Sequence, residues 1–291
     1  MTPAQIVEIE TPKKVLLNGL WFGPTKPARV FIAVHGLTSS AFSHRRFSSL
    51  VSEDTAVLTF SNRGHDAVTR VTRKVGKKGI SEFAGAAHEK FEDCADDIDG
   101  ALRFAQKNGA KEMYLIGHST GCQKSIYWAF VRKNKGIKGI VLLAPLSDYA
   151  GFVKHYPKKK RDAVLALAKK MIKEKRGTEL IPSRVWGEES DDAYRFISLY
   201  TPDSLEQSIF PYFDESRSVR MYASVTVPVL TFFAGSDEYH DRPPKQLAEW
   251  FLKNSGSSRY HGVIIPRVEH GFKGGEAQIA SIVREWMMAR K

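Results

Sequence analysis

Short apolar segments alternate with longer helical segments along most of this chain, and this alternation narrows the folds that it can adopt. Six short segments are almost continuous in apolar residues, as strands covered on both faces must be. They span residues 28–35, 55–60, 112–117, 139–144, 227–234 and 261–266, and the helical segments span 89–107, 122–132, 244–253 and 277–289. Such alternation predicts an α/β fold with a mostly parallel sheet flanked by helices. Residues 5–11 and 15–22 fit a more exposed hairpin.

The alternation stops between residues 146 and 226, where no convincing buried strand is visible. This stretch holds the cationic run KKKR at 158–161 and a basic helical pattern at 163–175. We interpret residues 146–226 as a helical lid inserted after the sixth predicted strand, with residues 1–145 and 227–291 forming one core. Its aromatic side chains either line a pocket or pack the lid onto the core, and both roles stay open. They are Trp186, Tyr194, Phe196, Tyr200, Phe210, Tyr212 and Phe213.

The sequence Gly117-His118-Ser119-Thr120-Gly121 joins a predicted buried strand to a predicted helix. A G-x-S-x-G sequence in this setting is typical of a nucleophile elbow. The turn is so tight that Ser119 must adopt a strained backbone, and side chains in place of the two glycines would collide with neighbouring elements. The strain exposes the hydroxyl, and the dipole of the following helix points at a developing oxyanion. Ser119 is therefore the candidate nucleophile.

A nucleophilic serine needs a histidine base, and in the elbow architecture the order along the chain is serine, acid, histidine. Four histidines follow Ser119. His155 lies in the lid, His261 lies at the entrance of a strand, and His240 is too close in sequence to the favoured acid to face it across a loop. His270 follows the last strand at its carboxyl end, the edge of an open α/β sheet where chemistry gathers. We therefore assign His270 as the candidate base.

The acid that orients this base should follow the preceding strand, which ends in the sequence TFFAGSD at 231–237. Asp237 occupies the first turn after that strand and is the favoured candidate. Glu238 and Asp241 are close rivals. Asp148, one strand earlier, is a structural alternative, because a loop there can also reach the base.

The oxyanion hole requires backbone N–H groups at a rigid turn. One N–H should come from Thr120, the residue after the nucleophile. The other should come from the turn that follows the strand at 28–35, where the sequence reads HGLTSS. Leu37 is the favoured donor in that turn and Thr38 is the second choice.

The order of HGL at 35–37, GHSTG at 117–121, GSD at 235–237 and EHGF at 269–272 resembles the α/β-hydrolase superfamily over nearly the whole chain except the lid. The resemblance implies the α/β-hydrolase fold, with Ser119 as nucleophile, Asp237 as acid, His270 as base and Leu37 as an oxyanion donor. SNRGHD at 61–66 looks like the superfamily's Arg-Gly-His-Gly turn, with Asp66 in place of the final glycine. GHSTGCQ at 117–123 with DEY at 237–239 is similar to a branch that includes fungal siderophore esterases.

These residues predict a serine hydrolase that cleaves a small-molecule carboxylic ester through an acyl-enzyme. Other chemistry by the same three groups stays open: C–C bond hydrolysis, thioester or amide hydrolysis, acyl transfer and perhydrolysis. No metal or cofactor is expected, because HExxH, CxxC, GxGxxG and GxxxxGK[ST] motifs are absent.

The net charge of +12 raises nucleic acid, anionic lipid and anionic substrates as partners. Nucleic acid is not expected, because no RRM, zinc-finger or KH signature is present and the aromatics do not interleave with the basic runs. Much of the charge lies at 70–78 and 154–176, so the basic lid is a candidate for peripheral contact with anionic surfaces. Two cysteines, no signal peptide and no long apolar run favour a cytoplasmic location. The oligomeric state is left open.

Overall fold

A ten-stranded sheet forms the centre of the molecule in the computed structural model, which describes residues 3–187 and 190–289. The strand order is β10-β9-β8-β7-β3-β4-β2-β5-β6, and β1 pairs with β2. The strands from β10 to β4 in this order are parallel, and β2 joins them antiparallel. The strands are β1 (Ala4–Glu10), β2 (Val15–Phe22), β3 (Arg29–Val34), β4 (Thr55–Phe60), β5 (Thr69–Val75), β6 (Lys78–Ala84), β7 (Glu112–His118), β8 (Gly139–Leu143), β9 (Val229–Ala234) and β10 (Tyr260–Ile265). The predicted α/β architecture is confirmed.

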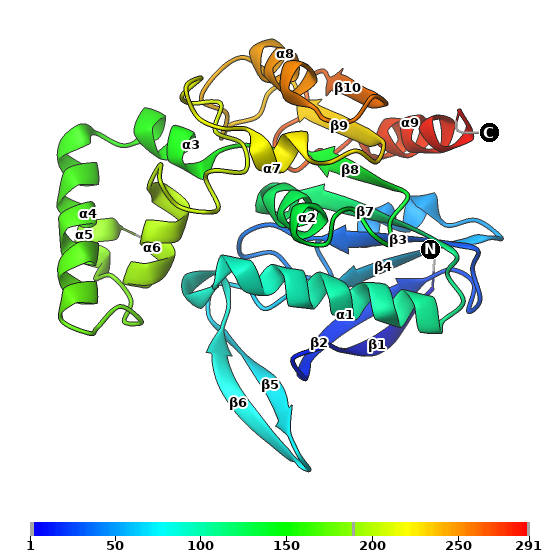
Figure 1. Ribbon diagram of the computed structural model, residues 1–291, viewed down its shortest axis with the longest axis horizontal. Coiled ribbons are helices and arrows are strands. Elements are labelled where there is room, and N and C mark those ends of the chain that lie inside the picture. Colours follow the sequence, from blue (N-terminus) through cyan, green and yellow to red (C-terminus); the bar gives the residue numbers. More distant parts are fainter. Residues whose placement is uncertain (1–2, 188–189, 290–291) are drawn as a thin grey trace.

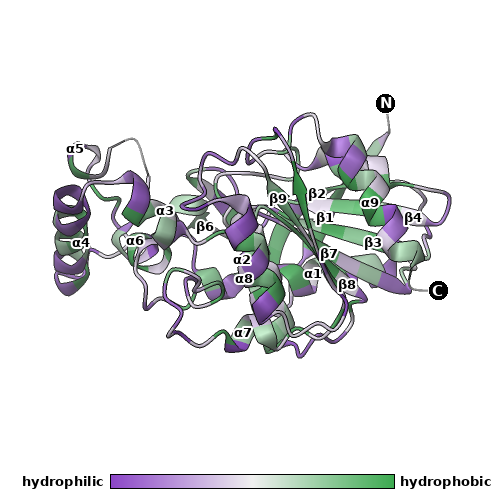
Figure 2. Cartoon of the chain, turned by 90° about the horizontal axis from the view of Figure 1, so that it is seen from above, coloured by the Kyte–Doolittle hydropathy of each residue, from purple (hydrophilic) through white to green (hydrophobic). Residues whose placement is uncertain are grey.

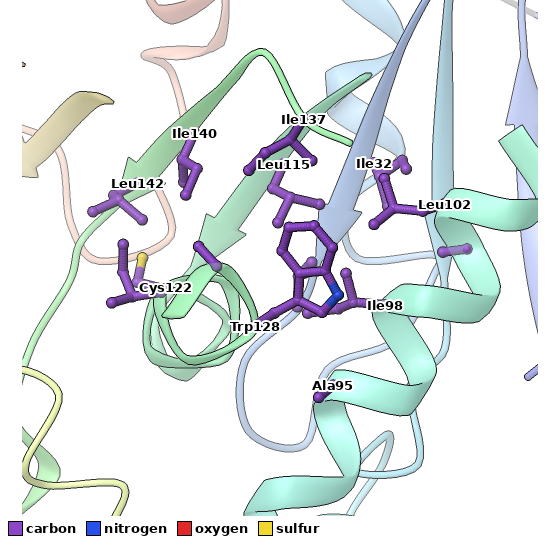
Figure 3. Close-up of a cluster of buried hydrophobic side chains, with 14 of the residues drawn as sticks. Ile32, Ala95, Ile98, Leu102, Leu115, Cys122, Trp128, Ile137, Ile140 and Leu142 are labelled. Carbon is purple, nitrogen blue, oxygen red and sulfur yellow. The ribbon is translucent and has the colours of Figure 1, made fainter. Parts of the chain in front are cut away.

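Helices cover both faces of the sheet (Figure 1). One face carries α1 (Cys94–Lys107), α2 (Thr120–Val131), α7 (Arg220–Ala223) and α8 (Pro244–Asn254), and the other carries η1 (Arg45–Leu50) and α9 (Glu276–Met288). Figure 3 shows part of the hydrophobic core on the first of these faces, where Trp128 of α2 and Ile98 of α1 pack against Leu115 of β7. β3, β4, β7, β8 and β9 are almost wholly buried, which explains their nearly continuous apolar sequences.

The hairpin of β5 and β6 extends away from the body of the molecule (Figure 1). The sequence analysis did not predict these two strands, because they are mostly exposed and carry many charged residues. They precede the lid along the chain, so the prediction that the lid follows the sixth strand is wrong. β8 is the eighth strand, although it is the same segment of sequence that we named as the strand before the lid.

Between β8 and β9 lie α3 (Asp148–His155), α4 (Lys158–Lys173), α5 (Ser183–Trp186) and α6 (Ala193–Tyr200), which form a group beside the sheet in both views (Figures 1 and 2). They share a separate hydrophobic cluster that includes Phe152, Met171, Trp186 and Phe196. The apolar side of α4 packs into this cluster, and its lysines other than Lys160 are exposed. Trp186 and Phe196 therefore pack the lid helices together.

The last part of the predicted lid packs on the main core. Ile209, Phe210, Tyr212, Tyr222 and Val225 are buried in the same cluster as the sheet and α1. The division into a core and a lid at residues 146–226 stays a prediction, but the separate hydrophobic cluster is confined to residues 152–200.

Four buried charges join the lid to the core. Lys124 of α2 lies 2.5 Å from Glu89, and Glu89 lies 3.1 Å from Arg195 of α6. Arg195 also lies 2.6 Å from Glu206. All four side chains are buried to at least 96%, since their exposures are 0–4%. The two cations and two carboxylates balance, so removal of any one leaves a buried charge without compensation.

In the part of the chain that the structure describes, no helix has the length and apolar character needed to cross a bilayer.

Lys124→Met should destabilise the protein, because it removes one of the two cations from the buried group of four charges. Glu89 and Glu206 would then share Arg195 alone, and the free energy of unfolding should fall by about 3–5 kcal/mol. Urea denaturation followed by circular dichroism measures the change. Lys158→Met is the control, because Lys158 pairs with Asp162 on the exposed surface and its loss should barely move the midpoint. Equal effects from the two variants would contradict the network's role.

Candidate active site

Ser119 stands at the sharp turn between β7 and α2, as predicted for an elbow. Its backbone has φ 55° and ψ −130°, a strained conformation for a residue with a side chain. A methyl group at Gly117 would lie 2.5 Å from the carbonyl oxygen of Gly121, and one at Gly121 would lie 2.0 Å from that of Val34. Both positions therefore require glycine. The tight turn at Ser119 can form only because Gly117 and Gly121 have no side chains.

Asp237 and His270 meet at the same edge of the sheet. Asp237 follows β9, His270 follows β10, and the Asp237 Oδ2 atom lies 2.8 Å from His270 Nδ1. The Asp237 side chain is fully buried. Burial raises the pKa of this carboxyl, but the hydrogen bond and the charge of His270 outweigh burial and leave the pKa below its usual value. The carboxylate is thus ionised where it orients the imidazole.

The loop that carries His270 is held on several sides. Its backbone N–H donates to Glu238 Oε2 at 2.9 Å, and His118 Nε2 lies 2.9 Å from its carbonyl oxygen. Arg46 donates to the carbonyl oxygen of Gly271. These contacts position the imidazole independently of its bond to Asp237.

The structure brings the rival acids to other partners. Glu238 accepts from the backbone of His270, Asp241 pairs with Arg242, and Asp148 Oδ2 accepts from Gln123 Nε2 at 3.1 Å. Among the described residues, the carboxylate of Asp237 is the one hydrogen-bonded to the His270 ring.

The prediction that His240 does not face Asp237 is wrong. We expected it to lie too close in sequence to Asp237 to face it, yet His240 Nε2 lies 3.1 Å from Asp237 Oδ2. The chain turns back at this point, because the Tyr239 N–H donates to Asp237 Oδ1 at 3.0 Å. His240 is buried, and burial lowers its pKa. The Asp237 carboxylate therefore faces two imidazoles.

The two predicted oxyanion donors belong to segments next to Ser119, the turn after β3 and the first turn of α2. Thr120 is the first residue of α2, so its N–H has no carbonyl partner within the helix. Leu37 and Thr38 line the same cavity as Ser119. A methyl group at Gly36 would lie 2.7 Å from Cβ of Ser119, so the turn after β3 approaches the serine as closely as glycine allows. Asp66, which stands where the resembling turn has glycine, has φ 56°, a left-handed conformation that favours glycine.

Two histidines beside the site are held neutral. Burial lowers the pKa of both His35 and His118 to about 3. His118 Nε2 faces a carbonyl oxygen, so the neutral ring carries its proton on Nε2 and donates it. His35 Nε2 accepts from the Asn62 N–H, so its Nδ1 donates to the carbonyl oxygen of Gly36. The two rings thus hold the Gly36 turn and the His270 loop without adding charge.

A cavity of about 750 Å³ opens over Ser119 and His270. The turn after β3 and the loops after β8, β9 and β10 form part of its wall, and α3 and α6 form another part. Tyr200 is the one lid aromatic from our predicted set among the described residues that line it. The volume of the cavity suits a small organic ligand. Among residues 3–187 and 190–289, no group of three His, Cys, Asp or Glu side chains is placed to hold a metal ion.

Comparison with known families identifies one match. Residues 76–290 match the family described as Protein of unknown function (DUF1749). The chain belongs to the DUF1749 family. The match covers the segments that carry Ser119, Asp237 and His270 and excludes β1 to β5. No curated protein sequence matches this DUF1749 chain.

Solved structures show that this DUF1749 protein has the α/β-hydrolase fold. The Pyrococcus furiosus esterase Pf2001 superimposes with a TM-score of 0.60 at 18% identity, over 99% of this chain and 91% of that one. Est1E from Butyrivibrio proteoclasticus with bound ferulic acid gives 0.61 at 16% identity, over 97% and 98%. The Paleococcus ferrophilus monoacylglycerol lipase gives 0.61 at 17% identity, over 94% and 99%. The α/β-hydrolase fold predicted from the sequence is confirmed, and the siderophore-esterase branch stays a prediction.

Titration by NMR should show that His35 and His118 stay neutral. With pKa values of about 3, their ring C–H shifts should not move between about pH 8 and about pH 5. In urea-unfolded protein the same rings should titrate with a midpoint at about pH 6.5. A folded-state midpoint near that value for either ring would contradict its assignment as a neutral donor.

Proposed function

We propose that this protein hydrolyses carboxylic esters with Ser119 as nucleophile, His270 as base and Asp237 as the acid that orients the base. The observation that carries the proposal is the 2.8 Å contact between Asp237 Oδ2 and His270 Nδ1, with His270 and Ser119 lining one cavity. The Nδ1 atom is engaged by Asp237, so Nε2 is the ring nitrogen that remains for Ser119.

The reaction proceeds through an acyl-enzyme. His270 Nε2 takes the proton of the Ser119 hydroxyl as the oxygen attacks the ester carbonyl. The buried carboxylate of Asp237 stabilises the imidazolium that forms, and the imidazolium then protonates the departing alcohol. Water repeats the sequence on the acyl-enzyme and releases the acid. The N–H groups of Leu37 and Thr120 bind the oxyanion in both halves.

The relatives support the ester as the substrate class. Two of the similar structures are named an esterase and a monoacylglycerol lipase, and a third holds ferulic acid. A thioester is the second candidate, because a thioesterase domain from the curacin biosynthetic pathway has the same fold, with a TM-score of 0.58 at 14% identity. Parallel assays of matched esters and thioesters distinguish the two.

Ser119→Ala should abolish hydrolysis of short-chain 4-nitrophenyl esters, with a loss of at least about 10³-fold in kcat/KM. A fluorophosphonate probe should label the unaltered protein and not this variant. Ser281→Ala is the matched control, since Ser281 lies exposed on α9. Undiminished turnover in Ser119→Ala would overturn the proposal.

Gly36→Ala tests the oxyanion hole separately. The added methyl group would lie 2.7 Å from Cβ of Ser119 and 2.9 Å from the carbonyl oxygen of His118, so the turn that carries the Leu37 N–H must move. We expect kcat to fall about 10²-fold, with a smaller change in KM. Gly275→Ala is the control, because a methyl group there has contacts of 3.4 Å or more. If both variants keep full kcat, Leu37 is not an oxyanion donor.

A further inference from the structure

The charged side chains that line the cavity are acidic, although the protein as a whole carries a net charge of +12. Asp148, Asp191 and Glu238 line the cavity, and no lysine or arginine belongs to the described part of its wall. The excess of cations lies elsewhere, for example along α4 and on the hairpin of β5 and β6. The formal charge of the described wall is therefore opposite in sign to the net charge of the protein.

Asp148 is fixed close to Ser119. It begins α3, just after β8, and its Oδ2 atom accepts from Gln123 Nε2 at 3.1 Å. Gln123 is buried and lies four residues after Ser119, one helical turn along α2. The same Nε2 atom donates to the carbonyl oxygen of Leu146 at 3.0 Å, so the amide orientation is determined. The carboxyl group is thus held in the wall of the same cavity by the helix that begins at the nucleophile.

No internal cation neutralises this carboxyl. Asp148 forms no ion pair with another residue in the ranges 3–187 and 190–289, and Arg195, whose positive charge acts on it, is already paired with Glu89 and Glu206. Burial and the Glu206 carboxylate raise the pKa of Asp148 to about 7, and the charge of Arg195 opposes the shift. Asp148 is half-buried and its carboxyl group has no ion pair, so a cation that enters the cavity would be a favourable partner for the carboxylate.

We propose that Asp148 is a specificity-determining residue that selects esters carrying a cationic group, such as an ammonium, in the acyl or the alcohol part. This inference rests on the proposed function of the cavity. Glu238, whose Oε2 atom accepts from the His270 N–H, lines the same cavity and adds a second negative charge to its wall. An ester with a carboxylate near the scissile bond would meet like charge in this wall and bind poorly.

Pairs of isosteric esters test the proposal, because a quaternary nitrogen and a quaternary carbon have the same shape. Acetylcholine and 3,3-dimethylbutyl acetate place the difference in the alcohol. Ethyl 4-(trimethylammonio)butanoate and ethyl 5,5-dimethylhexanoate place it in the acyl part. At about pH 8.5, where Asp148 is ionised, kcat/KM should favour the cation about 10- to 100-fold in at least one pair. Equal values within both pairs would overturn the proposal.

Asp148→Asn should reduce that ratio to near unity, because the amide keeps the shape and loses the charge. Asp162→Asn is the matched control: it changes the net charge equally, but Asp162 lies exposed on α4. The control should keep the preference of the unaltered protein. An unchanged preference in Asp148→Asn, or an equal loss in both variants, would contradict the role of Asp148.

Binding to Ser119→Ala separates this inference from the proposed function. Isothermal titration with acetylcholine and 3,3-dimethylbutyl acetate measures selectivity without turnover. Tighter binding of the cation, abolished by Asp148→Asn in the same background, supports the inference even if the unaltered protein hydrolyses no ester. Turnover of neutral esters that requires Ser119, with no preference for cations in binding or in kcat/KM, would leave the proposed function intact and overturn the role of Asp148.

Discussion

The close contact between the end of β3 and the first turn of α2 determines the geometry of the whole site. β3 pairs with β7 so that Val34 lies opposite Gly117, and the Val34 carbonyl approaches Gly121 at a distance that excludes any side chain there. The turn that begins at Gly36 consequently lies against Ser119. His118, held on the other side of the same elbow, contacts the backbone of His270. One steric constraint between two strands and a helix thus places Ser119, the turn at Gly36 and the loop of His270 together.

The position of each charged side chain depends on whether water or an opposite charge can stabilise it. Lysines on α4 and on the β5–β6 hairpin are exposed to water and cost little to maintain. Charges in the interior occur in compensated groups, as with Lys124, Arg195, Glu89 and Glu206. The described wall of the cavity, by contrast, carries acidic side chains and no lysine or arginine. The net charge of the sequence therefore describes the outer surface and not the environment of a ligand.

The sequence predicted the parts of the site that depend on strand order, because the carboxyl ends of parallel strands meet at one edge. Ser119, Asp237 and His270 each follow such a strand, and the structure places them there. The β5–β6 hairpin was missed because its residues are mostly exposed and lack the apolar signal of a buried strand. His240 was misjudged because spacing along the chain does not reveal the turn that returns it to Asp237. Arg195 and Glu206 carry no local signal, because they pair across 11 residues and Arg195 also pairs with Glu89, far away in sequence.

The lid helices act as a fixed wall of the cavity more than as a free flap. Arg195 of α6 is paired with Glu89 of the core in a site closed to water, and separating them would leave uncompensated charge at a cost of about 3–5 kcal/mol. Asp192 adds a contact to His88, and Lys154 of α3 donates to the carbonyl oxygen of His240. The last of these bonds connects the lid to the residue that shares the Asp237 carboxylate with His270. The position of α3, which carries Asp148, is therefore coupled to the geometry of the acid and the base.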